Sequence, residues 1–301
     1  MESIHDMIVI GGGPAGYTAA LYAARAGLDV VIIEKMSAGG QMAVTDVIDN
    51  YSGFDAGIPG WELGMKMQAG AERFGAVTKY AEVLSAELDN NIKKVRTSSG
   101  ELLSRTVVIA TGAGPRELGI PREAEFVSRG VHYCAHCDGR FYKNKVVAVV
   151  GGGNSALEDA LYLSRLASKV YLIHRRDSFR ASKIYVDALA QSTNIEFLAN
   201  SSVSGLIADE RVNGIRLADG RELEVNALFV SIGRKPASEI FAGQLELDAG
   251  GYIIADESTR TSLGGVFAVG DVRTKPLRQV VTAVGDGAVA VHFAEEYLSG
   301  M

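Results

Sequence analysis

Short runs of apolar residues alternate with glycine-rich turns along this chain. Residues 8–10 form one such run, followed by the turn 11–16, a predicted helix through 19–25 and a second apolar run at 30–33. Continuous, largely β-branched runs of this length are typical of strands that are buried on both faces of a parallel sheet. The pattern therefore predicts a strand–helix–strand unit that ends at Glu34.

The same order returns 140 positions later in the chain. Residues 147–150 predict a strand, 151–156 repeat the glycine turn, and a predicted helix leads to the apolar run 170–173. His174 then takes the place that Glu34 has in the first unit. Two such units predict an α/β fold made of two doubly wound, Rossmann-like modules.

A shorter repeat indicates where the chain passes from one module to the other. Residues 107–115 and 228–236 both read as apolar strands that end in glycine and proline. We therefore place the joints between modules near residues 114 and 242.

Two further segments carry a different pattern. Residues 79–99 and 195–223 alternate apolar and polar positions and contain turn residues. This alternation predicts antiparallel hairpins that flank each parallel sheet.

Composition narrows the classes of function. The chain has 301 residues, of which 47% are hydrophobic and 22% charged, and a formal net charge of −6. An acidic balance disfavours nucleic acid and anionic membranes as partners, because both require basic surface. No apolar segment is long enough to span a bilayer, and residues 1–6 lack the order of a signal peptide. We therefore expect a cytoplasmic protein, in which a CxxC pair is more often redox-active or metal-binding than structural.

The first glycine turn has the features of a dinucleotide site. Gly11 permits a tight turn, Gly13 lets a pyrophosphate approach the backbone beside Pro14 and Ala15, and Gly16 allows helix and strand to pack closely. The helix N-terminus offers free N–H groups to phosphate, and Glu34 can accept hydrogen bonds from ribose hydroxyls. FAD or NAD fits this set, and an ordinary glycine turn is the alternative.

The second turn ends in a basic cluster in place of an acid. His174, Arg175 and Arg176 follow the strand, and Arg180 comes soon after. Guanidinium groups form charge-assisted hydrogen bonds with a 2′-phosphate, which a carboxylate would repel. The cluster therefore favours NADP(H), with a solvated basic face as the alternative.

The only two cysteines of the chain, Cys134 and Cys137, are separated by two residues. A zinc site with His132 and His136, a pair of inert buried cysteines and a flavin-coupled redox disulfide are the open readings, and the last fits best. The spacing lowers the pKa of one thiol, and the thiolate is the nucleophile in disulfide exchange. Asp138 can return a proton to a leaving thiolate, or it can simply serve the turn.

Together these motifs resemble the low-molecular-weight thioredoxin reductases, and the resemblance runs along essentially the whole chain. The matching set comprises Gly11 to Gly16, Gly39-Gly40-Gln41, Ala110-Thr111-Gly112, Cys134-x-x-Cys137-Asp138-Gly139, Gly151 to Ala156, His174 to Ala181, Gly265 to Asp271 and Arg278-Gln279. Each motif alone is weak, but the ordered set is specific.

The resemblance implies a discontinuous FAD domain, residues 1–113 and 243–301, and an inserted NADPH domain, residues 114–242, that carries the CxxC pair. It implies further FAD contacts at Glu34, Lys35, Gly40, Gln41, Asn50, Val83, Thr111, Gly112, Asp271, Arg278, Gln279 and Val280. It implies NADPH contacts at Gly151, Gly153, Asn154, Ser155, Ala156, His174, Arg175, Arg176 and Arg180.

The resemblance also implies a homodimer in which electrons pass from NADPH to FAD and then to the disulfide. Cys137 would face the flavin, and Cys134 would attack the disulfide of thioredoxin. The NADPH domain would rotate on its two linkers, with Gly112, Gly114 and Gly243 as hinge positions.

Two positions depart from the family pattern. His136 lies between the cysteines, where an imidazolium would stabilise a thiolate and make the disulfide more oxidising. Arg140 replaces the first of two phenylalanines expected after Asp138 and Gly139, so the partner could be a variant thioredoxin or another small dithiol protein.

Other functions share parts of this pattern. A reductase driven by ferredoxin or free flavin would lose the basic NADPH cluster, as would an oxygen-dependent dithiol oxidase. A reductase of a peroxiredoxin-like partner would carry an extra N-terminal domain. A flavin- or zinc-binding regulator is the alternative from another class.

Overall fold

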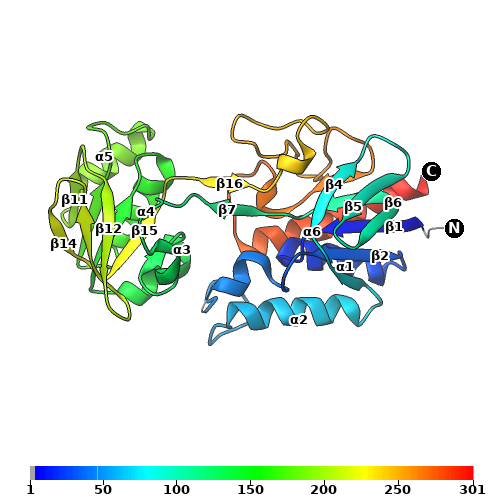
Figure 1. Ribbon diagram of the computed structural model, residues 1–301, viewed down its shortest axis with the longest axis horizontal. Coiled ribbons are helices and arrows are strands. Elements are labelled where there is room, and N and C mark those ends of the chain that lie inside the picture. Colours follow the sequence, from blue (N-terminus) through cyan, green and yellow to red (C-terminus); the bar gives the residue numbers. More distant parts are fainter. Residues whose placement is uncertain (1–3, 46, 301) are drawn as a thin grey trace. The chain divides into compact units, whose positions relative to one another are not determined.

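The computed structural model describes residues 4–45 and 47–300. Residues 1–3 belong to the N-terminal segment that we expect not to be a signal peptide, and they lie outside this range. The chain divides into two compact units: unit 1 contains Met1–Gly114 and Lys235–Met301, and unit 2 contains Pro115–Arg234. The predicted α/β fold class is confirmed by the central sheet of each unit, which is parallel throughout in unit 2 and parallel apart from one antiparallel hairpin in unit 1 (Figure 1).

Unit 1 is built on a seven-stranded sheet in the order β3-β2-β1-β6-β5-β4, with β17 paired to β6. Its strands are β1 (Ile4–Ile10), β2 (Val30–Glu34), β3 (Val77–Tyr80), β4 (Val83–Glu87), β5 (Lys93–Thr97), β6 (Gly100–Ile109) and β17 (Val266–Ala268). Its helices are α1 (Pro14–Arg25), α2 (Gly60–Glu72) and α6 (Val280–Ser299), with short 3₁₀ turns η1 (Gly40–Val44), η4 (Glu239–Phe241) and η5 (Gly270–Val272).

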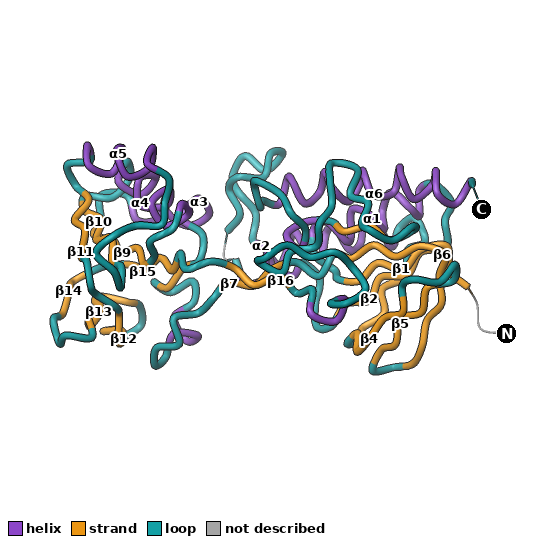
Figure 2. Tube along the Cα trace, turned by 90° about the horizontal axis from the view of Figure 1, so that it is seen from above, coloured by secondary structure: helices purple, strands orange, loops and turns teal. Residues whose placement is uncertain are grey.

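Both faces of this sheet are covered, which explains the unbroken apolar runs in the sequence. Met7, Val9 and Ile32 belong to the core that includes residues of α1 and α6, and Figures 1 and 2 show these two helices beside the sheet. Ile8 and Ile10 point to the other face, where they meet the segment that follows η4. Period-two alternation thus places apolar side chains in two separate cores.

Unit 2 repeats this plan around a five-stranded parallel sheet in the order β11-β10-β9-β15-β8. Its strands are β8 (Val131–His132), β9 (Val146–Val150), β10 (Lys169–Ile173), β11 (Ile195–Leu198) and β15 (Ala227–Val230), and a separate three-stranded sheet contains β12 (Val203–Ala208), β13 (Val212–Leu217) and β14 (Glu222–Glu224). Its helices are α3 (Ala135–Asp138), α4 (Asn154–Ser164) and α5 (Lys183–Gln191), with 3₁₀ turns η2 (Glu123–Phe126) and η3 (Gly139–Tyr142). The helices pack on one face of the parallel sheet and the second sheet packs on the other (Figure 2).

The hairpin prediction is correct for β4–β5 and for β12–β14, but it is wrong at the start of each segment. β3 pairs in parallel with β2, and β11 pairs in parallel with β10. Both are edge strands of a parallel sheet. Their residues are largely exposed or half-buried, so their sequences carry the alternation expected of a hairpin strand.

The two chain segments that connect the units pair with each other, as β7 (Ala113–Pro115) and β16 (Arg234–Pro236). The second boundary therefore precedes the position expected near 242. The physical reason is that Phe241 and Leu245 are buried in the core of unit 1, and Gln244 donates to the Ala86 carbonyl at 2.8 Å. Of the expected hinge glycines, Gly112 and Gly243 have positive φ, 73° and 84°.

Candidate active site

The first glycine turn joins β1 to α1 in a conformation that leaves its outer side open. Gly11 has φ of 107°, and a Cβ on Gly16 would lie 1.9 Å from the Gly11 carbonyl oxygen. A Cβ on Gly13 would meet nothing within 4 Å, and α1 begins directly afterwards at Pro14. The turn thus combines close helix–strand packing with an exposed helix N-terminus, which is the arrangement that a pyrophosphate needs.

Glu34 lies at the end of β2, beside this turn. Its Oε2 accepts from the backbone N–H of Gly12 at 2.7 Å, and its Oε1 accepts from that of Met36 at 2.9 Å. A carboxylate has about four acceptor positions, so both oxygens can still accept from ribose hydroxyls. The neighbouring Lys35 forms a surface ion pair with Glu82 at 2.7 Å.

Contacts within unit 1 gather several of the other expected FAD residues. A Cβ on Gly40, in η1, would lie 3.4 Å from Cα of Gly13, so η1 packs against the glycine turn. The amide of Asn50 donates to Gln279 at 3.0 Å. Arg278 donates to the backbone carbonyl of Asp271 at 3.3 Å.

The remaining expected FAD residues have other local partners. The carbonyl of Gln41 accepts from Thr45 at 3.4 Å, and the Thr111 hydroxyl donates to the Ala237 carbonyl at 2.6 Å. Val280 packs against the small cluster that contains Met42, and Val83 packs partly against the sheet core.

Asp286 of α6 connects the segment around Gly270 with two buried basic side chains. The sequence interpretation did not identify it. Its carboxylate accepts from Arg273 at 2.9 Å, from Lys275 at 2.8 Å and from the backbone N–H of Gly270 at 2.8 Å. Burial alone would raise the pKa of Asp286, but the hydrogen bonds and charges of Arg273 and Lys275 outweigh it, so the pKa is lowered. The network fixes Gly270 immediately before Asp271.

A cavity of about 760 Å³ opens at the second glycine turn. Of the expected NADPH residues, the cavity is lined by Gly151, Gly153, Asn154, Ser155, His174, Arg175 and Arg180. Ala156 is buried beneath the turn, and Arg176 is exposed but is not among the lining residues. The structure thus brings together two of the three predicted arginines.

His174 lies against the second glycine turn and lines the cavity. Its ring packs so closely on the turn that a Cβ on Gly152 would lie 2.4 Å from it. Its side chain is buried, and its Nε2 has no hydrogen-bond partner among the described residues. Burial, followed by the charges of Arg175, Arg176 and Arg180, lowers the pKa of His174, so the ring is neutral near pH 7. A neutral ring with an unpaired nitrogen can contact a nucleotide without adding to the local charge.

The basic loop is tied directly to the glycine turn. The backbone N–H of Arg180 donates to the Gly152 carbonyl at 2.8 Å. The backbone N–H of Ser182 donates to Oδ1 of Asn154 at 2.8 Å, and the Ser182 hydroxyl donates to the same oxygen at 3.0 Å. These bonds hold the arginines at the mouth of the cavity.

The cavity also contains residues that the sequence interpretation missed. These are Arg116, Glu117, Leu118, Val150, Gly152, residues 201–203 and residues 231–233. Residues 231–233 could have been predicted from the apolar strand in 228–236, because residues that follow parallel strands meet at one edge of the sheet.

Cys134 and Cys137 form a disulfide with a Cα–Cα distance of 5.3 Å. Cys134 caps the short helix α3, and its Sγ accepts from the backbone N–H of Cys137 at 3.2 Å. The disulfide bond engages both sulfurs. Among residues 4–45 and 47–300, no group of three or more His, Cys, Asp or Glu side chains could hold a metal ion.

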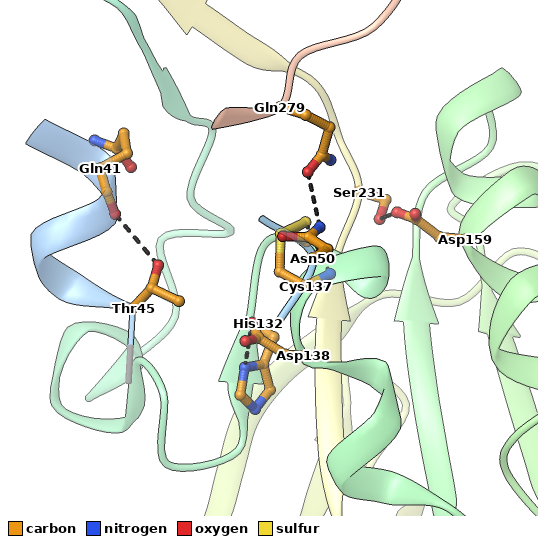
Figure 3. The surroundings of a disulfide bond; sticks show 10 residues. Gln41, Thr45, Asn50, His132, Cys137, Asp138, Asp159, Ser231 and Gln279 are labelled. Carbon is orange, nitrogen blue, oxygen red and sulfur yellow. Dashed lines mark hydrogen bonds and ion pairs between the residues drawn. A yellow bond between two sulfur atoms is a disulfide. The ribbon is translucent and has the colours of Figure 1, made fainter. Parts of the chain in front are cut away.

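Asp138 is connected to buried groups behind the disulfide (Figure 3). Its Oδ2 lies 2.9 Å from Nδ1 of His132, and Nε2 of that ring lies 2.7 Å from the hydroxyl of Tyr142. The sequence interpretation considered His132 only as a possible zinc ligand and did not single out Tyr142, because no spacing rule connects either residue to Asp138.

The two residues that depart from the family pattern both lie near the surface. His136 is exposed, and its ring centroid lies 4.2 Å from that of Tyr162 in α4. Arg140 lies over the exposed ring of Phe141 at 5.6 Å. On the inner side of α4, Asp159 accepts a short hydrogen bond from Ser231, shown in Figure 3. Burial raises the pKa of Asp159 despite that hydrogen bond.

Comparison with known proteins decides the family. A family model described as pyridine nucleotide-disulphide oxidoreductase matches residues 5–287. The thioredoxin reductase of Listeria monocytogenes is 45% identical over 99% of this chain and 95% of its own length. The chain belongs to the thioredoxin reductases of this family.

Two further relatives support this assignment. A crystal structure of thioredoxin reductase from Streptococcus pyogenes matches with a TM-score of 0.93 and 42% identity, covering 100% of both chains. The bifunctional thioredoxin reductase/thioredoxin of Mycobacterium leprae is 44% identical over 99% of this chain and 67% of its own length. The family uses FAD and NADPH, so the two coenzymes expected from the sequence are confirmed. Within the described part of the chain, no helix is long and apolar enough to cross a membrane.

Proposed function

We propose that this chain is an NADPH-dependent thioredoxin-disulfide reductase in which unit 1 binds FAD and unit 2 binds NADPH. The observation that carries this proposal is the cavity of unit 2, where Arg175 and Arg180 flank a neutral His174 beside a glycine turn. Guanidinium groups at this place suit a 2′-phosphate. In unit 1, the open side of Gly13 and the free acceptor positions of Glu34 fit the pyrophosphate and ribose of FAD.

Bound FAD would take two electrons from NADPH and deliver them to the disulfide. The residues of the chain then handle the thiol chemistry. Cys137 is the thiol nearer the flavin, and Cys134 is the nucleophile that attacks thioredoxin. Asp138 returns a proton to the leaving thiolate. The proposed FAD contacts include Asp271, Arg278 and Gln279, together with the other unit 1 residues named above.

Further parts of the proposal concern the setting of the enzyme. We place it in the cytoplasm as a homodimer that does not bind nucleic acid. Exposed Arg140 and Phe141 follow the disulfide, so they belong to the surface that meets the partner. A thioredoxin with an acidic or polar rim, or another small dithiol protein, suits this surface better than a wholly apolar partner.

The decisive experiment is rapid-mixing reduction of the yellow protein by NADPH and by NADH, followed by turnover with thioredoxins of the host. Bleaching by NADPH but not NADH at equal low concentration supports the proposal. A ferredoxin- or flavin-dependent reductase would be bleached by neither nucleotide, and a regulator without a reductase activity would fail to turn over thioredoxin.

A matched set of variants tests the role of the arginines. Arg175→Gln combined with Arg180→Gln should weaken NADPH binding by about 10- to 100-fold, because a hydrogen bond to a charged group contributes roughly 1.5–3 kcal/mol. NADH binding should change little. Arg176→Gln is the control, because Arg176 belongs to the same cluster but does not line the cavity. Equal losses for NADPH and NADH would contradict 2′-phosphate recognition.

A further inference from the structure

A buried chain of hydrogen bonds runs from Asp138 into the interior of unit 2. The carboxylate of Asp138 faces Nδ1 of His132 at 2.9 Å (Figure 3). Nε2 of the same ring faces the Tyr142 hydroxyl at 2.7 Å. His132 is only 5% exposed. Both nitrogens of a buried imidazole are therefore engaged, one of them by the residue that directly follows Cys137.

The fold holds this imidazole in one orientation. His132 ends β8, where it pairs in register with Phe229 of β15. Its ring stacks on Phe229 with a centroid distance of 5.2 Å and meets the edge of Tyr142 at 5.2 Å. An imidazole fixed on two sides by aromatic rings and at both nitrogens by hydrogen bonds has little freedom to turn away from Asp138.

The roles of donor and acceptor in these hydrogen bonds follow from Tyr142 and Asp138. Burial, only partly countered by the charge of Arg211, raises the pKa of Tyr142 to about 12. The phenol is therefore neutral at physiological pH, and its oxygen can donate to Nε2 of a neutral ring or accept from Nε2–H of an imidazolium. An ionised carboxylate only accepts, so Nδ1 carries a proton and donates to Asp138 in both states.

Other charged groups around the chain are few among the described residues. Arg211 directly precedes β13, and its charge lowers the pKa of Tyr142. The ammonium of Lys145 lies 5.7 Å from the Tyr142 ring centroid. His136 belongs to the same short helix as Asp138, but its ring packs on Tyr162. His132 is thus the group that faces the Asp138 carboxylate directly.

We propose that His132 is a positioning residue that holds the Asp138 carboxyl beside the disulfide and keeps it supplied with the proton used in thiol–disulfide exchange. This rests on the proposed reductase function. The imidazole ring can hold a proton beside the carboxylate, as imidazolium–carboxylate, and pass it to the carboxyl by a single shift along the 2.9 Å hydrogen bond.

Exchange starts from the reduced enzyme with the His132–Asp138 pair carrying one proton, as imidazolium and carboxylate. The Cys134 thiolate attacks one sulfur of the partner disulfide, so a Cys134–partner bond forms and the partner S–S bond breaks. The released partner thiolate takes the proton through Asp138 as Nδ1 of His132 passes it to the carboxyl, which leaves a neutral imidazole beside the carboxylate, and the pair regains a proton from solvent before the next turnover. Cys137 then gives up its thiol proton and attacks Cys134, which restores the Cys134–Cys137 disulfide and releases the second partner sulfur as a thiolate that takes up that proton. The enzyme dithiol is oxidised and the partner disulfide is reduced.

The test is single-turnover oxidation of the flavin-containing dithiol enzyme, reduced with dithiothreitol, desalted and then quenched for thiol counting. The variant His132→Asn keeps a side-chain donor near the position of Nδ1 but cannot titrate. Against oxidised thioredoxin at pH 7 we expect a rate about 100-fold below wild type, the lower end of the range for general acid catalysis. Against dithiobis(nitrobenzoate), whose leaving thiolate is stable without a proton, we expect less than threefold loss.

Dividing the wild-type rate by the variant rate removes the pH dependence of the attacking thiolate, because that thiolate is present in both proteins. With thioredoxin this ratio should change with pH, because only the wild-type side chain at position 132 can take up and release a proton, whereas with dithiobis(nitrobenzoate) it should stay below about three at every pH. A constant factor at every pH and for both disulfides would reveal a purely structural role and overturn the proposal. Equal rates for wild type and variant would overturn it as well.

Further variants guard against misfolding and remote effects. Tyr142→Phe removes the hydroxyl that holds Nε2 of His132 and should slow exchange with thioredoxin about threefold to tenfold, in the same pH-dependent way. His292→Asn is the control, because His292 is an exposed histidine of unit 1. Ring ¹⁵N spectra of the oxidised wild type should show a protonated Nδ1 in His132, and an unprotonated Nδ1 would contradict the proposal.

Failure of the proposed function is distinguishable from failure of this inference. If the wild-type dithiol does not reduce thioredoxin, the reductase proposal fails. Glutathione disulfide, whose leaving thiolate is also strongly basic, then replaces thioredoxin in the same comparison, and the role of His132 is still decided by the leaving-group and pH dependence.

Discussion

Substitution of Asp286 by Asn should destabilise unit 1 strongly. The carboxylate accepts two hydrogen bonds from Arg273, at 2.9 Å each, and further ones from Lys275 and Gly270. The side chains of Arg273 and Lys275 are only 3% and 4% exposed. Asparagine keeps one acceptor oxygen but removes the carboxylate to which both buried cations are hydrogen-bonded. We expect a loss of about 3–4 kcal/mol, within the range for a broken buried ion pair.

The pH dependence of this loss follows from the lowered pKa of Asp286. A carboxyl whose pKa is lower in the folded than in the unfolded state stabilises the fold above its unfolded pKa, about 4. That stabilisation is lost as pH falls through the folded pKa. The difference in free energy of unfolding between wild type and Asp286→Asn should therefore be constant above about pH 5 and shrink below pH 4.

The assay uses the single tryptophan of the chain, Trp61, which lies in α2 of the same unit. Urea unfolding of the FAD-loaded protein, followed by Trp61 fluorescence, reports on unit 1 rather than on the whole two-unit chain. The control is Glu296→Gln on the same helix, whose ion pair with Arg260 is about half exposed and contributes only about 0–1 kcal/mol. Similar losses for the two variants, or a difference that does not change with pH, would refute the reasoning.

The remaining predictions concern the turn and the dithiol. Gly16→Ala should lower the melting temperature, because its Cβ would lie 1.9 Å from the Gly11 carbonyl oxygen and overpacking costs about 1–3 kcal/mol. Gly13→Ala should leave melting of the FAD-free protein unchanged but weaken FAD binding at least tenfold by equilibrium dialysis; unaltered FAD affinity would contradict a pyrophosphate at this turn. His136→Thr should make the dithiol potential more negative by about 10–30 mV in a redox titration, since the exposed imidazolium no longer favours the thiolate. An unchanged potential would exclude that role for His136.

Much of the scaffold could be predicted because it depends on local patterns. The glycine turns and the apolar runs around Gly11 and Gly151 specify strand, turn and helix within one segment, and the repeat identifies both units. β3 and β11 could not be distinguished from hairpin strands. An exposed edge strand has the same alternation in either case, and the choice of partner depends on distant residues.

The site was predictable only where residues follow one another in sequence. Arg175 and Arg180 were found because they follow a strand, but sequence could not separate them from Arg176, whose side chain lies off the cavity. The contact of His132 with Asp138, and the role of Asp286, were missed for a related reason. Their partners are brought to them by sheet pairing and helix packing, and a lone buried histidine or aspartate has no signature in sequence.

The internal repeat has a consequence for how such a protein can diverge. In each unit the residue at the end of the second strand, Glu34 or His174, lies against the glycine turn of that unit. The buried cores lie on the strands and helices behind that turn. New side chains at the end of a single strand can therefore change the coenzyme that a unit accepts while the packing of its core stays intact.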